Sequence, residues 1–218
     1  MQNDLRERIV DVASEMMRRR GYADVDVTEV CRASGVARAQ FYRTFDGKRG
    51  LGVAVVERFS EERSALLDRA LHPEMPIRGQ IQRMFSMLHQ EQRTAFEETG
   101  RVPGSYFTLF VDLSEEEQVL RSAVDEALDA WRGRLAAAIE AASARGEVKL
   151  PDPTYPATAI IAFAEGALQL ARTLNRPDIM LELAPASMSL LIDRRATGSW
   201  PMILLSSGAF PTVGSKPT

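Results

Sequence analysis

The sequence predicts an all-α protein, and three observations support that prediction. Apolar residues recur at helical spacing along most of the chain, glycines and prolines interrupt the pattern at intervals, and no stretch shows the alternation typical of a strand. A chain of 218 residues can bury a core without a disulfide or a metal. We therefore expect one or two helical domains.

The first helix is predicted to end at Arg20, where three cations precede a glycine. Asp26 and Glu29 have the spacing of a capping box, which predicts that the second helix begins near Val27. Gly35 is expected to close that helix in a tight turn, because glycine adopts a positive backbone angle at little cost.

Two further helices complete the first seventy residues. A short third helix follows the glycine turn and places Phe41 and Phe45 on one face. Asp46 and Gly47 break it, and a fourth helix is predicted to continue to about Ala70. This segment is expected to join two parts of the chain.

The larger second part also shows only helical patterns. Ser114 and Glu117 form another capping box, and a cluster of prolines after residue 150 is interpreted as a turn. The predicted helices cover residues 77–99, 105–112, 115–145, 157–175 and 177–193. We expect a head at residues 1–50, a helical body at 51–195 and a flexible tail at 196–218.

Charge is distributed unevenly between these parts. The whole chain carries a formal charge of -3, yet its first fifty residues hold 10 of the 27 basic residues and 8 of the 30 acidic ones. Between Val30 and Val56 the only acid is Asp46, and the basic residues there are Arg32, Arg38, Arg43, Lys48 and Arg49. Such a local excess suits a phosphate backbone, although an ordinary solvated surface would also explain it.

The second helix, the glycine turn and the third helix have the order of a helix-turn-helix unit, which lays its second helix in the major groove of DNA. The stretch from Arg8 to Val55 also resembles the DNA-binding domain of the TetR family of transcriptional regulators. The resemblance rests on motifs that occur in the family's order without gaps: Gly21-Tyr22, Asp26 to Glu29, Ala33-Ser34-Gly35-Val36, Phe41-Tyr42 and Phe45 followed by Lys48. Beyond this first quarter, only the order and length of the helices are similar.

The resemblance implies roles for particular residues. Arg38, Gln40 and Arg43 are expected on or near the exposed face of the third helix, where arginine can read guanine and glutamine can read adenine. Tyr42 and Lys48 match family positions that contact the DNA backbone. Ala37 stands where the family usually has Ser or Thr, so a capping hydroxyl is missing, although alanine can still touch a thymine methyl group. Together with Gln40, it implies a distinctive operator preference.

Cys31 is the only cysteine and occupies an interior position of the second helix. We interpret it as a packing residue, with a redox switch as the alternative that no second cysteine supports. The lack of a cysteine pair and of a secretory signal predicts a cytoplasmic protein.

The body is expected to dimerise, because one recognition helix covers too few base pairs to find a genomic site. The resemblance also implies a pocket for a small ligand among the helices of the body. The resemblance places dimer contacts on the last two long helices. Glu165 and Gln169 are expected to serve either a polar ligand group or hydrogen bonds across the dimer. Candidate residues for an adaptable apolar pocket are Met84, Phe85, Leu88, Phe107, Phe110, Trp131 and Phe163.

These features predict a homodimeric repressor that a small lipophilic molecule releases from a palindromic operator. An activator, or a ligand-binding module of the same fold, is the alternative. Catalysis is not expected, because His72 and His89 are the only histidines and neither has a metal-site or triad spacing. We expect His72 to be exposed and His89 to lie on the polar side of its helix, and we predict no metal, cofactor or membrane segment.

Overall fold

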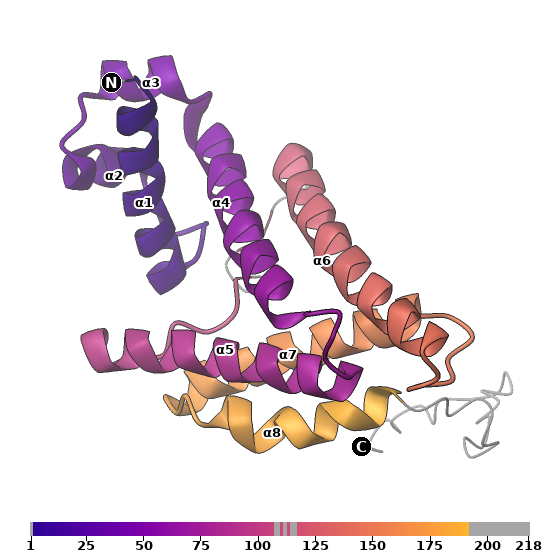
Figure 1. The fold of residues 1–218 in the computed structure, drawn as a ribbon. Coiled ribbons are helices and arrows are strands. Elements are labelled where there is room, and N and C mark those ends of the chain that lie inside the picture. Colours follow the sequence, from indigo (N-terminus) through magenta and orange to yellow (C-terminus); the bar gives the residue numbers. More distant parts are fainter. Residues whose placement is uncertain (1, 107–109, 111–112, 114–116, 192–218) are drawn as a thin grey trace, which may run out of the picture.

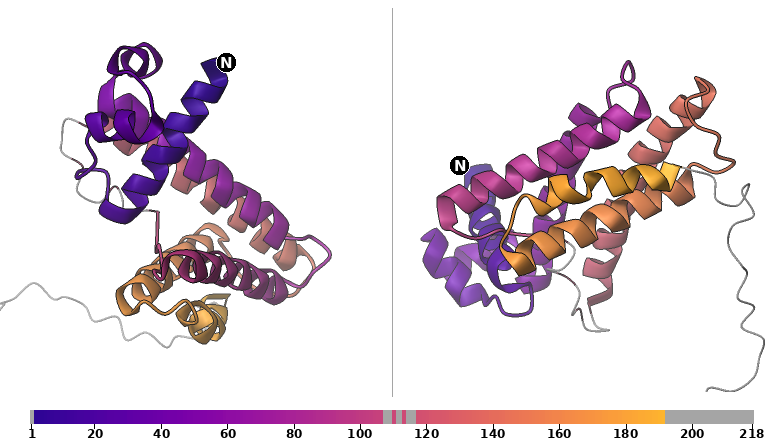
Figure 2. Two further views of the ribbon diagram at one scale, coloured as in Figure 1. Left: turned by 90° about the vertical axis from the view of Figure 1, so that its left-hand side faces the viewer. Right: turned by 90° about the horizontal axis from the view of Figure 1, so that it is seen from below.

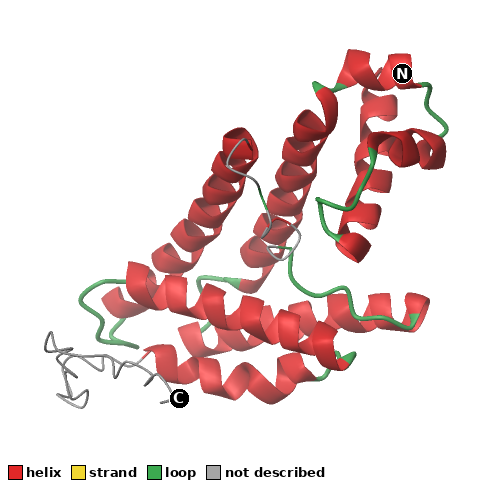
Figure 3. Ribbon diagram, turned by 180° about the vertical axis from the view of Figure 1, so that it is seen from behind, coloured by secondary structure: helices red, strands yellow, loops and turns green. Residues whose placement is uncertain are grey.

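A computed structural model describes residues 2–106, 110, 113 and 117–191. Within this part of the chain every regular element is helical, as Figure 3 shows from behind. The predicted all-α class is therefore confirmed. The elements in chain order are α1 (Gln2–Arg20), α2 (Val27–Ser34), α3 (Arg38–Thr44), α4 (Gly47–Ala70), α5 (Ile77–Thr99), α6 (Gln118–Ala144), α7 (Thr154–Leu174), α8 (Ile179–Ser187) and the 3₁₀-helix η3 (Met188–Leu191).

The helices form two groups, which we call the head (α1 to α3) and the body (α4 to α8). In Figure 1 the head lies at one end of the long helix α4, and α6 runs beside α4. Figure 2 shows α5, α7 and α8 side by side across the other end of α4. The helix α4 thus connects the head to the rest of the body.

One apolar core continues from head to body without a break. Phe41, Leu51 and Leu66 are fully buried, and they mark the path of this core from α3 along α4. Burial of this kind, at about 25 cal/mol per Å² of apolar surface, is the main stabilising term for the helices. The head is therefore packed on α4, and a movement of α4 would displace it.

The helix α6 is described from Gln118 onward, and Ser114 of the predicted capping box lies outside the described residues. The Glu117 carboxylate accepts a hydrogen bond from Tyr22. One predicted start needs correction. The helix α7 begins at Thr154, three residues early, and includes Pro156. Proline fits the first turn of a helix because the N–H groups there have no partner within the helix. Asp152 accepts a hydrogen bond from the Thr154 amide at 2.8 Å.

The last predicted helix is also shorter than expected. The helix α8 ends at Ser187, two residues after Pro185, and continues as η3 to Leu191. Ser105 and Tyr106 are not helical, and most of the helix predicted at 105–112 lies outside the described residues. The predicted tail and Phe107 also lie outside them.

Candidate nucleic-acid interface and ligand cavity

The turn between α2 and α3 fixes the angle between these two helices. Gly35 adopts φ 66°, and its amide donates to the Arg32 carbonyl at 3.3 Å. The next amide, that of Val36, donates to the Cys31 carbonyl at 2.9 Å. These bonds close α2 in the left-handed conformation that favours glycine, as the sequence predicts.

The start of α2 is fixed by charged side chains. Asp26 accepts a hydrogen bond from the Thr28 amide at 2.6 Å. Hydrogen bonds from the Thr28 side chain and from this amide lower the pKa of the Asp26 carboxyl. Arg20, at the end of α1, donates to Glu29 at 2.9 Å, and this bond is the main reason that the pKa of Glu29 is lowered. The predicted N-terminus of α2 is confirmed, and Glu29 also ties α2 to α1.

The short helix α3 buries one side and exposes the other. Phe41 is fully buried, with the Phe45 ring centroid 5.5 Å away and that of Tyr42 at 5.2 Å in an edge contact. The exposed side carries the residues predicted to contact DNA: Ala37, Arg38, Gln40, Tyr42 and Arg43. A helix packed in this way presents its polar face to a groove.

Three of these exposed side chains, those of Arg38, Gln40 and Tyr42, have hydrogen-bond partners in α3 or at its N-cap. The Gln40 side-chain oxygen accepts a hydrogen bond from the Ala37 amide at 3.3 Å. Glutamine thus caps a helix whose N-cap alanine has no hydroxyl. Arg38 is hydrogen-bonded to Tyr42, which raises the pKa of Arg38 and keeps it charged. The predicted base contacts of Arg38, Gln40 and Arg43 stay predictions.

Lys48, predicted to bind phosphate, lies in the first turn of α4. Its ammonium group donates to the Ala23 carbonyl at 2.7 Å and lies 4.7 Å from the centre of the Tyr22 ring. Lys48 therefore joins α4 to the loop between α1 and α2, and its remaining N–H groups are the ones left for a phosphate.

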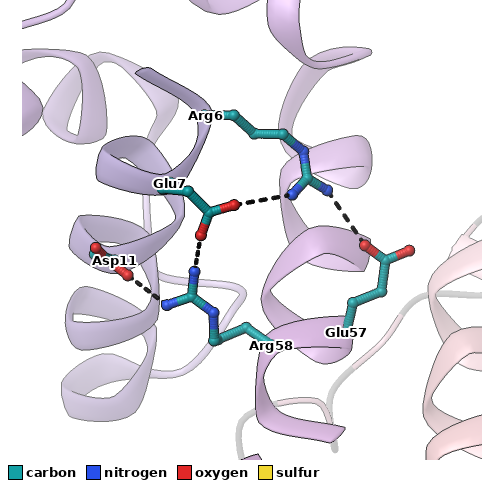
Figure 4. A network of polar contacts seen from close by, with 5 residues as sticks. All are labelled: Arg6, Glu7, Asp11, Glu57 and Arg58. Carbon is teal, nitrogen blue, oxygen red and sulfur yellow. Dashed lines mark hydrogen bonds and ion pairs between the residues drawn. The ribbon is translucent and has the colours of Figure 1, made fainter. Parts of the chain in front are cut away.

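Ion pairs connect α1 to the first half of α4 (Figure 4). Arg58 of α4 pairs with Glu7 and, at 2.5 Å, with Asp11. Arg6 of α1 pairs with Glu57 at 3.3 Å and with Glu7 at 3.8 Å. We call these five residues the upper cluster. Every member has an opposite charge beside it.

The described residues of the predicted apolar pocket belong to the core. Phe163 is partly buried and lies 6.0 Å from Phe85 between ring centroids. Trp131 donates from its indole nitrogen to the Ser60 carbonyl at 3.3 Å. The other buried members are Met84, Phe85, Leu88 and Phe110. None of these side chains lines the cavity that contains Arg18 and Tyr106, so their contact with a ligand stays a prediction.

That cavity has a volume of about 690 Å³ and lies where α1, α4, α5 and the 103–106 segment meet. Its lining mixes charged and apolar side chains, unlike the apolar pocket predicted from the sequence. The residues that line it are Arg18, Glu62, Ala65, Arg69, Met87, Gln90, Glu91, Gln92, Thr94, Ala95, Glu98, Pro103, Gly104 and Tyr106.

The sequence reasoning missed Arg18, Arg63 and Tyr106 at this place. Arg63 is only 6% exposed, and it lies four residues from both Phe59 and Leu67 on the buried face of α4. An arginine on the apolar stripe of a helix is a signal that could have been found. Tyr106 lies in a segment that was predicted to be an apolar helix, so no polar role was predicted for its hydroxyl.

Glu165 and Gln169 differ in their surroundings. The Glu165 carboxylate accepts a hydrogen bond from Ser105 within the same chain, and burial raises its pKa. Gln169 is exposed. The predicted contacts of these two residues, with a polar ligand group or across the dimer, stay predictions.

The histidines and the cysteine differ in how they fit the predictions. His72 is exposed, as predicted. The prediction for His89 is wrong, because it is 8% exposed and its ring bonds to Asp178 at 2.9 Å, at the start of α8. Cys31 is buried, and burial raises the pKa of its thiol, which agrees with a packing role.

The described part of the chain contains no group of three His, Cys, Asp or Glu side chains placed to hold a metal ion. None of its helices is long and apolar enough to span a membrane.

Comparison with protein families gives two matches. Residues 9–55 match the model described as bacterial regulatory proteins of the tetR family, which spans α1 to α3 and the start of α4. Residues 104–186 match the model described as a tetracyclin repressor-like C-terminal domain. A curated relative, the transcriptional regulator AcuR of Cereibacter sphaeroides, is 29% identical over 175 residues, which cover 78% of this chain and 77% of AcuR.

Solved structures share the fold over most of the chain. The regulatory protein TetR from Rhodobacter sphaeroides superposes with a TM-score of 0.69 at 23% identity, over 85% of this chain and 98% of that one. FadR from Bacillus subtilis, solved in complex with stearoyl-CoA, gives a TM-score of 0.66 at 17% identity, over 86% and 97%. At these identities the likeness concerns the fold.

Proposed function

The chain belongs to the TetR family of bacterial regulatory proteins, and from this premise we propose that it is a repressor released from a palindromic operator by a small molecule. Its membership makes it a DNA-binding transcriptional regulator. The observation that carries the proposal is the exposed face of α3, held at a fixed angle by the Gly35 turn and packed through Phe41.

Arginine at positions 38 and 43 gives α3 two groups that can donate paired hydrogen bonds to guanine. A bidentate contact discriminates the correct base from others by about 1–3 kcal/mol. Lys48 and the amide groups at the start of α4 supply the phosphate contacts that set the register. Loss of Arg43 is therefore expected to affect sequence preference, whereas loss of Lys48 weakens binding to all sequences.

A homodimer is the second part of the proposal, because two half-sites are needed for a specific affinity. The exposed side of α7 carries a stripe at four-residue spacing, made of Thr158, Ala162, Gly166, Leu170 and Leu174. Leu181 of α8 is also 43% exposed. A Cβ atom added to Gly166 would have no neighbour within 4 Å, so the surface is open to the helix of a second copy.

Selection of bound sequences from random duplex DNA tests the proposal. The wild-type chain is expected to enrich a palindrome, and Arg43→Ala is expected to lose information at one position of each half-site. Arg93→Ala is the matched control, since Arg93 is an exposed arginine of α5 in the body. The salt concentration is held fixed, because phosphate contacts depend steeply on it. Enrichment of no sequence would refute the proposal.

A further inference from the structure

Arg63 is a buried arginine whose donors are only partly used. Its Nη1 lies 3.5 Å from the Glu91 carboxylate, yet neither Nη1 nor Nε forms a hydrogen bond, and both atoms are buried. An unsatisfied buried donor costs about 1–3 kcal/mol, and more when the group is charged. A folded protein that keeps such a group calls for a partner that completes it.

A second arginine lies at the same place. Arg18 of α1 also has a buried Nε without a hydrogen bond. Its guanidinium carbon lies 5.4 Å from the centre of the Tyr106 ring, and that of Arg63 lies 5.2 Å from the same centre. Tyr106 stacks on Phe59 with 4.2 Å between centroids, and Arg18 also faces Phe59 at 5.7 Å. We call Arg18, Phe59, Arg63 and Tyr106 the lower cluster.

Both guanidinium carbons lie within 5.4 Å of the centre of the Tyr106 ring, so two like charges gather around one ring. Cation–π contacts stabilise each guanidinium by about 0.5–2 kcal/mol, but they provide no hydrogen-bond acceptor for the N–H groups. The two positive charges repel each other. An anion that accepts from both arginines would remove the repulsion and satisfy the donors together.

The carboxylates around the lower cluster do not fill this role. Glu62 accepts a hydrogen bond from the Tyr106 hydroxyl at 3.1 Å. Burial raises the pKa of Tyr106 to about 12, so this hydroxyl keeps its proton. Partial burial raises the pKa of Glu91, whose side chain is 40% exposed, and burial raises the pKa of Glu165, to which Ser105 already donates. Neither carboxylate is a hydrogen-bond partner of the unsatisfied Arg18 and Arg63 atoms.

A ligand can reach this place from solvent. Arg18, Glu91 and Tyr106 line the cavity of about 690 Å³. Arg63 is not among the lining residues, but its guanidinium lies 3.5 Å from Glu91 and 5.2 Å from the centre of the Tyr106 ring, and thus adjoins the cavity. The same cavity offers Ala65, Met87 and Ala95 to a hydrocarbon chain. It therefore combines an apolar wall with one cation in its lining and a second beside it, and each has an unsatisfied buried donor.

We propose that the effector is an organic acid whose anionic group is bound by Arg18 and Arg63 and whose hydrocarbon part occupies the cavity between α4 and α5. The inference rests on the proposed function and adds the chemical class of the effector. Charge-assisted hydrogen bonds from arginine suit a carboxylate because the guanidinium can donate two parallel N–H groups to it.

The position of this anion also explains how it controls the head. Arg18 belongs to α1, within the segment that matches the DNA-binding model, whereas Arg63 belongs to α4. An anion held by both arginines ties the head to one position on the body. If DNA needs a different position, operator and anion weaken each other's binding by the same factor.

Calorimetric titration of the full chain tests the effector class. The probes are acetate, butyrate, hexanoate and octanoate, each beside the neutral amide of the same chain length, at one pH and salt concentration. We expect at least one carboxylate to bind about tenfold or more tightly than its amide, the factor that a lost charge-assisted hydrogen bond implies. Equal binding of acid and amide, or no binding by any probe, would overturn the inference.

Two variants test the residues. Arg63→Met and Arg18→Met are each expected to remove the preference for carboxylate over amide. If one of the two variants does not fold, the other still tests the assignment. Arg93→Met, which removes an exposed arginine of α5 outside the cavity lining, is expected to keep it. A preference that persists in both cluster variants would contradict the assignment.

The result is separable from the test of DNA binding. If the chain enriches a palindrome but shows no preference for carboxylates, the effector class is wrong and the regulator stands. If carboxylates bind through Arg63 but no DNA sequence is enriched, the proposed repressor fails and the anion site stands.

Discussion

Two arginine clusters lie along the same contact between α1 and α4, and they differ in how completely their donors are paired. In the upper cluster, Arg6 and Arg58 lie among three carboxylates on the protein surface (Figure 4). In the lower cluster, Arg18 and Arg63 lie against two aromatic rings with buried N–H groups unsatisfied. The comparison separates a contact that holds the head in place from one that needs a ligand.

The difference has an energetic basis. Exposed ion pairs are screened by water and contribute about 0.2–1 kcal/mol each, so the upper cluster stabilises the contact modestly under all conditions. A buried charge without hydrogen bonds destabilises the fold until a partner arrives. Arginines that keep unpaired donors beside a cavity therefore lower the stability of the free protein in a way that a bound ligand can reverse.

The largest effect on the free energy of unfolding is expected at Gly104, which lines the cavity beside the lower cluster. Gly104 adopts φ 82°, and a Cβ atom there would lie 2.7 Å from the Arg172 side chain. Gly104→Ala should lower the free energy of unfolding by about 2 kcal/mol, from backbone strain together with this clash. Arg172 also donates to the Arg19 carbonyl at 3.3 Å, so its displacement loosens the end of α1.

Gly100→Ala is the matched control for this change. Gly100 has a similar φ of 70°, but a Cβ atom there would meet nothing within 4 Å. Urea unfolding of the two variants compares strain alone with strain plus the clash. An equal loss of stability in both would show that the contact with Arg172 is unimportant.

The comparison of the clusters is tested directly by removing one arginine from each. Arg58→Met should lower the free energy of unfolding by about 1 kcal/mol, because Glu7 and Asp11 lose their partner. Arg63→Met should leave the free energy of unfolding unchanged or raise it, since methionine fills the space without a buried charge. Glu91 is 40% exposed and can be hydrated after the change. A larger loss from Arg63→Met than from Arg58→Met would reverse the interpretation.

A small, pH-dependent effect is expected in the head. The folded chain lowers the pKa of Asp26 below its ordinary value of 3.8, mainly through the hydrogen bond with Thr28. The contribution of Asp26 to stability is therefore complete above that value and is lost as the pH falls through the lower, folded pKa. Asp26→Asn keeps an oxygen that can cap α2 and should remove this part of the acid dependence. Unfolding curves in urea from pH 5 downward would show no difference between the two proteins if the cap contributes nothing.

Most of the head could be predicted from the sequence because its signals are local. Asp26 and Gly35 fix the ends of α2 through their own backbone preferences, and Phe41 and Phe45 define the buried face of α3 by spacing alone. The remaining positions of α3 are then expected to be exposed. What spacing could not show is that Gln40 caps its own helix and that Lys48 binds the Ala23 carbonyl.

The cavity proposed to hold a ligand could not be predicted in the same way, because it is formed by segments that are distant in the chain. Arg18 and Tyr106 in its lining and Arg63 beside it come from α1, the 103–106 segment and α4, and no periodicity relates them. Bulky apolar residues are the local signal for a pocket, yet Met84 and Leu88 are buried in the core and do not line this cavity. Pro156 lies inside α7 rather than before it, because proline fits the first turn of a helix.

The central claim is that anion and operator compete through the lower cluster, and reciprocal titration tests it most directly. The affinity for the tightest-binding carboxylate is measured with and without the selected operator, and the affinity for operator with and without that carboxylate. The account predicts one factor in both directions, and no change in either for Arg63→Met. Operator binding that is unaffected by a carboxylate bound at Arg63 would contradict the account.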